Sequence, residues 1–194
     1  MELTAYQIDV MREIGNIGMG NAATSLSVML NSAISMTIPT VKILDKDETK
    51  KMTDELYKDS YAIYLTLTEG LGGYIVHFMK TSFAEKIIST FFPTTITTPE
   101  DIDEMGKSII AEMGNITSAS YVNSIASFSG ITIDISTPNE CADLINDTSI
   151  FSEDGKKLIY VDTSFFIDQD EIKSMLFFAP DEESIEKLIS ALKI

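Results

Sequence analysis

Residues 9–16 read DVMREIGN, and residues 108–115 read SIIAEMGN. Each stretch carries a glutamate and, three positions later, an asparagine, and 22 further residues separate that asparagine from a proline. Four pairs of residues therefore match at a constant spacing of 99 positions: Asp9 and Ser108, Glu13 and Glu112, Asn16 and Asn115, Pro39 and Pro138. A repeat that keeps both polar identity and a long spacer indicates an internal duplication, with halves at about 1–93 and 100–194.

The apolar pattern predicts the same order of elements in both halves. In the first half we expect a helix over 4–30, a strand over 33–44, a short helix over 45–58, strands over 60–69 and 72–79, and a helix over 81–92. After a linker over 93–100, the second half repeats this order at 101–128, 131–138, 139–147, 157–167 with 172–179, and 181–192. Because four of the strands form hairpins, the sequence predicts one α/β (α+β) domain over 1–194, with pseudo-two-fold symmetry and a largely antiparallel sheet flanked by helices.

Composition narrows the function classes. Apolar residues make up 44% of the chain and charged residues 23%, which is typical of a globular protein. A formal charge of −16, from 14 basic and 30 acidic residues, argues against a nucleic-acid partner and a membrane-surface role, because both need clustered cations. Cys141 is the single cysteine, so an internal disulfide is excluded. No signal peptide or membrane span is visible, and we expect a cytoplasmic protein.

The repeated polar residues share one face of each predicted helix. Residues 9, 13 and 16 fall at i, i+4 and i+7, and so do residues 108, 112 and 115. Gly15 and Gly114 separate the glutamate from the asparagine in both copies, where a missing side chain would let a partner approach the helix backbone. Each set alone could be a solvated helix surface. Its occurrence twice, in register, favours a functional role.

The residue types restrict the chemistry that such a face can perform. One carboxylate and one carboxamide are too few ligands for a metal site built by this chain, and neither is a conventional nucleophile. His77, the single histidine, lies in a predicted strand, where we expect a structural role. An asparagine carboxamide both donates and accepts hydrogen bonds, which suits it to orient a water molecule for attack on an electrophile supplied by a partner.

The pattern Asp/Ser-x3-Glu-x2-Asn-x22-Pro resembles that of the CheC, CheX and FliY family of chemotaxis phosphatases, and EIGNIGMGNAAT at 13–24 is similar to a CheC first helix. The resemblance covers essentially the whole chain. It implies hydrolysis of the aspartyl phosphate of the response regulator CheY, with Asn16 and Asn115 orienting the water and Glu13 and Glu112 holding the regulator. Asp9, Ser108, Pro39 and Pro138 would support the motif. The chain would need no cofactor, because the Mg²⁺ would belong to CheY.

Within this family the chain most resembles CheC. CheX-like proteins have one site, whereas both motifs are intact in this sequence. FliY-like proteins carry an added flagellar-switch domain, which we do not expect here. The resemblance also implies binding of the receptor deamidase CheD through 139–147, with Asp143 as the residue to test. We expect a monomer. The alternative is a weakly catalytic or non-catalytic adaptor that binds phosphorylated CheY and regulates CheD.

Overall fold

The computed structural model describes residues 4–57, 59–141, 158–167 and 170–193. Within these ranges, strands from both halves form one antiparallel sheet with the order β1-β7-β8-β4-β3-β5, in which β2 also pairs with β7 and β6 with β3. The strands are β1 (Ile34–Met36), β2 (Thr40–Leu44), β3 (Ser60–Glu69), β4 (Gly73–Lys80), β5 (Asp134–Ile135), β6 (Asn139–Glu140), β7 (Leu158–Ile167) and β8 (Asp170–Pro180).

The two halves exchange strands. The first half's β1 and β2 pair with β7 of the second half, and the second half's β5 and β6 pair with β3 of the first. The hairpins β3–β4 and β7–β8 meet at the centre of the sheet, where β4 pairs with β8. Neither half has a complete sheet of its own, so the duplication is folded into one unit. The predicted fold class is confirmed.

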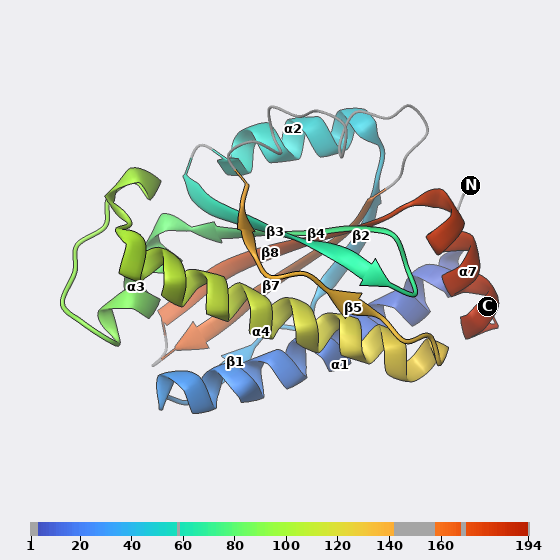
Figure 1. Ribbon diagram of the computed structural model, residues 1–194, viewed down its shortest axis with the longest axis horizontal. Helices are drawn as coiled ribbons and strands as arrows, with labels where there is room; N and C mark the ends of the chain where they lie inside the picture. Colours follow the sequence, from blue (N-terminus) through green and yellow to red (C-terminus); the bar gives the residue numbers. More distant parts are fainter. Residues whose placement is uncertain (1–3, 58, 142–157, 168–169, 194) are drawn as a thin grey trace.

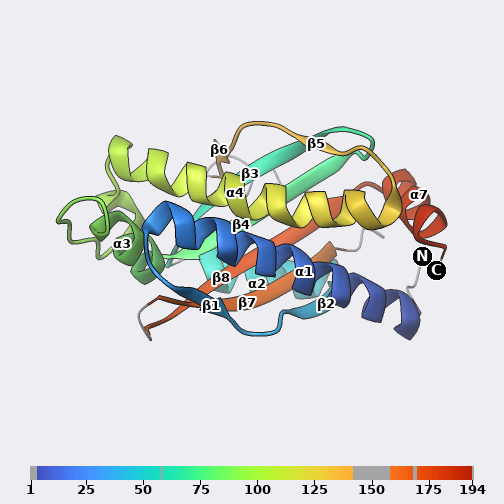
Figure 2. The same cartoon turned by 90° about the horizontal axis from the view of Figure 1, so that it is seen from below.

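The helices cover both faces and both ends of this sheet. The long helices α1 (Ala5–Leu30) and α4 (Glu104–Ser129) lie side by side on one face and run in opposite directions, as Figure 2 shows. On the other face lies α2 (Lys46–Tyr57), and α3 (Thr81–Ser89) and α7 (Glu182–Leu192) occupy opposite ends of the molecule (Figure 1). The pseudo-two-fold relation therefore exchanges α1 with α4 and α3 with α7.

The strands supply two separate hydrophobic clusters because their side chains alternate between the faces of the sheet. Along β3, Ile63 and Leu65 join the large cluster that packs under α1 and α4, whereas Ala62 joins the smaller cluster on the other face. In β8, Leu176 and Phe178 face the large cluster, and Met175 and Phe177 face the small one. The large cluster is the layer that fixes the two long helices on the sheet.

Four predicted elements differ from those observed. The strand expected over 33–44 is two strands separated at 37–39, and the one expected over 131–138 is reduced to β5. Pro39 and Pro138 lie at these breaks, as expected for residues without a backbone N–H. The short helix expected over 139–147 begins instead as strand β6, and its positions from 142 onward lie outside the described residues. The helix expected over 101–128 begins at Glu104, after a 3-10 turn over Pro99–Asp101.

Candidate functional site

The first turns of α1 and α4 are fixed by side-chain caps. Thr4 Oγ1 accepts a hydrogen bond from the backbone N–H of Gln7 at 3.2 Å, and the backbone N–H of Thr4 donates to Gln7 Oε1 at 2.8 Å, which forms a capping box. Asp103 caps α4 by accepting from the backbone N–H of Gly106 at 2.8 Å. Each polar motif thus begins about one turn inside a well-anchored helix.

The exposure of the motif side chains is the same in both copies. Glu13 and Glu112 are exposed, and Asn16 and Asn115 are half-buried. The two support positions, Asp9 and Ser108, are also exposed, and the apolar residues that follow the glutamates, Ile14 and Met113, are buried in the core. The structure therefore places each predicted triplet on one accessible helix face, directly beside the stripe that packs on the sheet.

These two faces point away from each other. A Cβ atom on Gly18 would lie 2.9 Å from the Cα of Tyr121, so Gly18 marks the side of α1 that contacts α4. At about 100° per residue, Asp9 lies about 180° around the helix from Gly18, and Glu13 about 140°. Thr117 holds the position of Gly18 in the second copy and is fully buried. The two motif faces consequently lie on opposite flanks of the α1–α4 pair.

The glycines within the motifs face the sheet, so the prediction that they admit a partner is wrong. A Cβ on Gly15 would lie 3.7 Å from Val41 Cγ2, and one on Gly114 would overlap the side chain of Ile63. Both glycines are buried. The missing side chain of Gly114 allows α4 to lie close against β3, whereas a Cβ at Gly15 would make only ordinary contact with β2.

Each motif proline lies in the break between two short strands that follow the long helix. Pro39 is buried between β1 and β2, and Pro138 is half-buried between β5 and β6. Two residues beyond Pro39, Val41 pairs with Val161 and packs under Gly15. Glu140 holds the position equivalent to Val41 in the second copy. In the first half, the strand that follows the proline therefore lies beneath the motif turn, whereas in the second half β6 pairs with β3, whose Ile63 lies beneath Gly114.

The two motif faces differ in their charged neighbours, which the repeat pattern did not predict. At the first site, Arg12 forms an ion pair of 2.7 Å with Asp9, and the second copy has Ala111 in place of Arg12. Next to Ser108, Lys107 contacts Glu140 at 3.0 Å and Glu104 at 3.3 Å. Hydrogen bonding to Glu140 and Glu104 raises the pKa of Lys107 above its ordinary value. The i, i+3 spacing of Asp9 and Arg12 was a signal that could have revealed the first pair.

Other candidate reactive groups are buried. His77 is completely enclosed by the sheet and α4, and this desolvation lowers its pKa to about 4, so the ring is neutral at pH 7. Burial raises the pKa of the Cys141 thiol to about 12, which keeps it protonated. Among the residues that the structure describes, no group of three or more His, Cys, Asp or Glu side chains could hold a metal ion. Asp143 lies outside the described residues.

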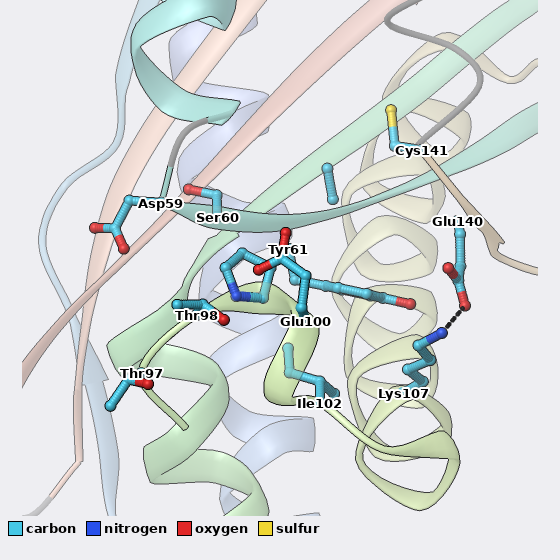
Figure 3. A pocket seen from close by; sticks show the side chains of 12 residues that line it. Asp59, Ser60, Tyr61, Thr97, Thr98, Glu100, Ile102, Lys107, Glu140 and Cys141 are labelled. Atoms are coloured by element: carbon cyan, nitrogen blue, oxygen red, sulfur yellow. Dashed lines mark ion pairs between the residues drawn. The ribbon is translucent and has the colours of Figure 1, made fainter. Parts of the chain in front are cut away.

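A cavity of about 630 Å³ lies near the start of α4, apart from the motif residues. Figure 3 shows its walls: the beginning of β3 with Tyr61, the 97–102 segment, and the Lys107–Glu140 ion pair beside Cys141. Burial and the nearby Glu140 carboxylate raise the pKa of Tyr61. Neither the Glu–Asn pair of α1 nor that of α4 contributes to this cavity.

The comparisons with known proteins decide the family. The model of the CheC-like family matches residues 7–43 and 105–139, two segments that each contain a motif and its proline. The CheY-P phosphatase CheC of Bacillus subtilis is 32% identical over 197 residues, which cover 96% of this chain and 93% of that protein. The chain belongs to the CheC family. This membership gives it a role in chemotaxis, and it confirms the resemblance drawn from the duplicated motif.

Solved structures of related proteins have the same fold as this chain. Thermotoga maritima FliY superposes with a TM-score of 0.76 at 26% identity, covering 100% of this CheC-family chain and 98% of that one. The FliM middle domain from H. pylori has a TM-score of 0.75 at 13% identity, covering 97% and 99%, which shows a shared fold alone. In the described part of the chain, none of the helices combines the length and apolar character needed to cross a membrane.

Proposed function

We propose that this CheC-family chain is a phosphatase that hydrolyses the aspartyl phosphate of the response regulator CheY. The observation that carries the proposal is the duplicated Glu–Asn pair on the accessible faces of α1 and α4, in a chain 32% identical to a CheY-P phosphatase. Each face is half of an active site, and the partner supplies the phosphoaspartate. Because the faces lie on opposite flanks, each one can receive its own regulator molecule.

The carboxamides of Asn16 and Asn115 orient the attacking water. The side-chain oxygen accepts a hydrogen bond from the water, which directs a lone pair of the water oxygen toward phosphorus. The new P–O bond forms as the bond between phosphorus and the aspartyl oxygen breaks, and the products are inorganic phosphate and the regulator's free carboxylate. A Mg²⁺ ion belonging to the regulator would neutralise phosphoryl charge, so this chain would need no cofactor of its own.

The glutamates hold the regulator. Glu13 and Glu112 are exposed and lie almost one turn before the asparagines, so a lysine of the regulator can approach them from solvent. Asn16 and Asn115 are half-buried, and a half-buried side chain has less conformational freedom to lose when it positions the water. Asp9 and Ser108 support the same faces, one turn earlier.

A second partner, CheD, remains a prediction. The family resemblance assigns its contact to 139–147, and Asn139 and Glu140 of that segment form strand β6 on β3. Glu140 contacts Lys107 beside Ser108, whereas the first motif face lies on the opposite flank, so CheD bound at this edge would leave the first face open to the regulator. Asp143→Ala tests the contact, and unchanged binding of CheD by that variant would remove the assignment.

The decisive experiment is phosphate release from a phosphorylated CheY receiver domain in the presence of Mg²⁺. The double variant Asn16→Ala/Asn115→Ala should release phosphate no faster than the receiver domain alone, because both water-orienting carboxamides are lost. Its thermal unfolding should match that of the wild type, since both side chains lie partly in solvent. Full activity of the double variant would contradict the proposal. Tight regulator binding by a wild-type chain without turnover would instead favour the adaptor function.

A further inference from the structure

Exposed large apolar side chains are few in the part of the chain that the structure describes, and two of them are related by the internal repeat. Among the described residues six such side chains are exposed: Tyr6, Val28, Ile38, Phe91, Met105 and Phe128. Tyr6 and Met105 stand 99 positions apart, with exposures of 65% and 63%. The positions equivalent to the other four hold Ser127, Thr137, Ser190 and the partly buried Met29. Exposure of a large apolar residue is thus kept in both copies at this position alone among the described residues.

Both residues lie on the motif faces. Tyr6 precedes Glu13 by seven residues, which is almost two full helical turns, so the two side chains differ by only about 20° around α1. Met105 has the same relation to Glu112. The spacing of residues 6, 9, 13 and 16 is the 3-4-3 pattern of one continuous stripe along a helix. Each accessible face consequently begins with an apolar residue and ends with the asparagine.

We propose that Tyr6 and Met105 are contact residues that dock against an apolar patch of the phosphorylated receiver domain, about 15 Å from its phosphoaspartate. This inference rests on the proposed function, because the occupant is the same regulator. It enlarges each site from a Glu–Asn pair to a stripe that also contains an apolar anchor. The regulator is the expected partner of this stripe because Tyr6 and Met105 are continuous with the motif faces on which the regulator is proposed to bind.

The dimensions of the stripe fit a single partner domain. At about 1.5 Å per residue, Tyr6 lies about 10 Å from Glu13 and about 15 Å from Asn16 along the axis of α1. A typical interface covers about 800 Å² on each partner, equivalent to a circle with a radius of about 16 Å. A receiver domain seated over Asn16 therefore reaches residue 6, and the same holds for Asn115 and residue 105.

The residue types also suit a contact role. Tyrosine and methionine are enriched in protein interfaces, where tyrosine offers a large ring with a polar tip and methionine adapts to uneven surfaces. Attraction between Glu13 or Glu112 and a regulator lysine is weakened by salt, whereas burial of an apolar side chain is not. The apolar contact would thus supply the part of the affinity that persists at high ionic strength.

The test measures KM for the phosphorylated receiver domain at one site at a time. Tyr6→Ser is made in the Asn115→Ala chain, and Met105→Ser in the Asn16→Ala chain. Each should raise KM about fivefold to tenfold and leave kcat unchanged. The matched controls are Val28→Ser for the first site and Phe128→Ser for the second, which are exposed apolar residues on the same helices. They lie more than about 30 Å along the axis from Tyr6 and Met105, and about 18–20 Å from the asparagines, outside the radius of a typical interface.

Controls that keep the parental KM, together with raised KM values for the two test variants, support the inference. An unchanged KM for Tyr6→Ser and Met105→Ser overturns it. So does an equal rise in the control variants, because the effect would then not be local to the stripe. The double asparagine variant reports separately on the proposed function, since it removes turnover whether or not residues 6 and 105 touch the regulator.

Discussion

Replacing Gly18 with alanine tests the close approach of α1 to α4. This contact is what directs the two motif faces away from each other. A Cβ at Gly18 would lie 2.9 Å from the Cα of Tyr121 and 3.3 Å from the backbone oxygen of Ser120, so the backbone of α4 would have to move. Such overpacking costs about 1–3 kcal/mol of unfolding free energy. Gly20 is the matched control, because a Cβ there would meet nothing within 4 Å. Both substitutions gain about the same helix propensity, roughly 1 kcal/mol.

The difference between the two variants therefore isolates the overpacking cost. We expect Gly18→Ala to be less stable than Gly20→Ala by about 1–3 kcal/mol, measured by urea unfolding. At about 2–4 °C per kcal/mol for a chain of this size, the difference in Tm is about 2–12 °C. Gly20→Ala should also keep its activity, because Ala119 holds the equivalent position in the second copy. The reasoning is refuted if Gly18→Ala is as stable as Gly20→Ala.

Three further predictions concern stability. The folded-state pKa of His77, about 4, lies below its unfolded value of about 6.5, so the unfolded chain binds more protons between these values and stability falls as pH falls. His77→Leu should remove about 2 kcal/mol of the loss between pH 7 and pH 5, and an unchanged pH slope of urea unfolding would contradict this. Arg12→Ala breaks the exposed ion pair with Asp9 and should lower the free energy of unfolding by no more than about 0.5 kcal/mol in the same assay. A loss above about 1.5 kcal/mol would be inconsistent with a surface ion pair. Asp181 caps α7 by accepting a hydrogen bond from the backbone N–H of Ser184 at 2.8 Å. Asp181→Ala should lower the free energy of unfolding by about 1 kcal/mol, and Asp181→Asn by less, because asparagine can also cap a helix. Equal losses in the two variants would rule out the cap as the cause.

The sequence predicted the duplication and the motif faces because both depend on local periodicity. A 3.6-residue period places residues 9, 13 and 16 on one face wherever the helix packs, and the constant spacing of 99 shows that the chain has two such helices. The exchange of strands between halves was not predictable in this way. Nothing in the alternation of β2 indicates that Val41 pairs with Val161 of the other half.

The surroundings of individual residues on a helix could not be predicted from the sequence either, because they depend on which elements pack against that helix. Gly15, Gly18 and Gly20 look alike as helix glycines, yet they face the sheet, α4 and open space. The exposure of Tyr6 and Met105 could not be predicted for a related reason. The repeat relates Tyr6 to Met105 by position, but only the fold shows that both side chains stay exposed while most apolar residues on α1 and α4 are covered.

The most direct test of the two-site account is the rate of phosphate release at saturating phosphorylated receiver domain for four proteins. These are the wild type, Asn16→Ala, Asn115→Ala and the double variant. The account predicts that the rates of the two single variants add up to that of the wild type, because the sites lie on opposite flanks, and that the double variant falls to the rate of the receiver domain alone. A double variant that keeps the wild-type rate would contradict the account.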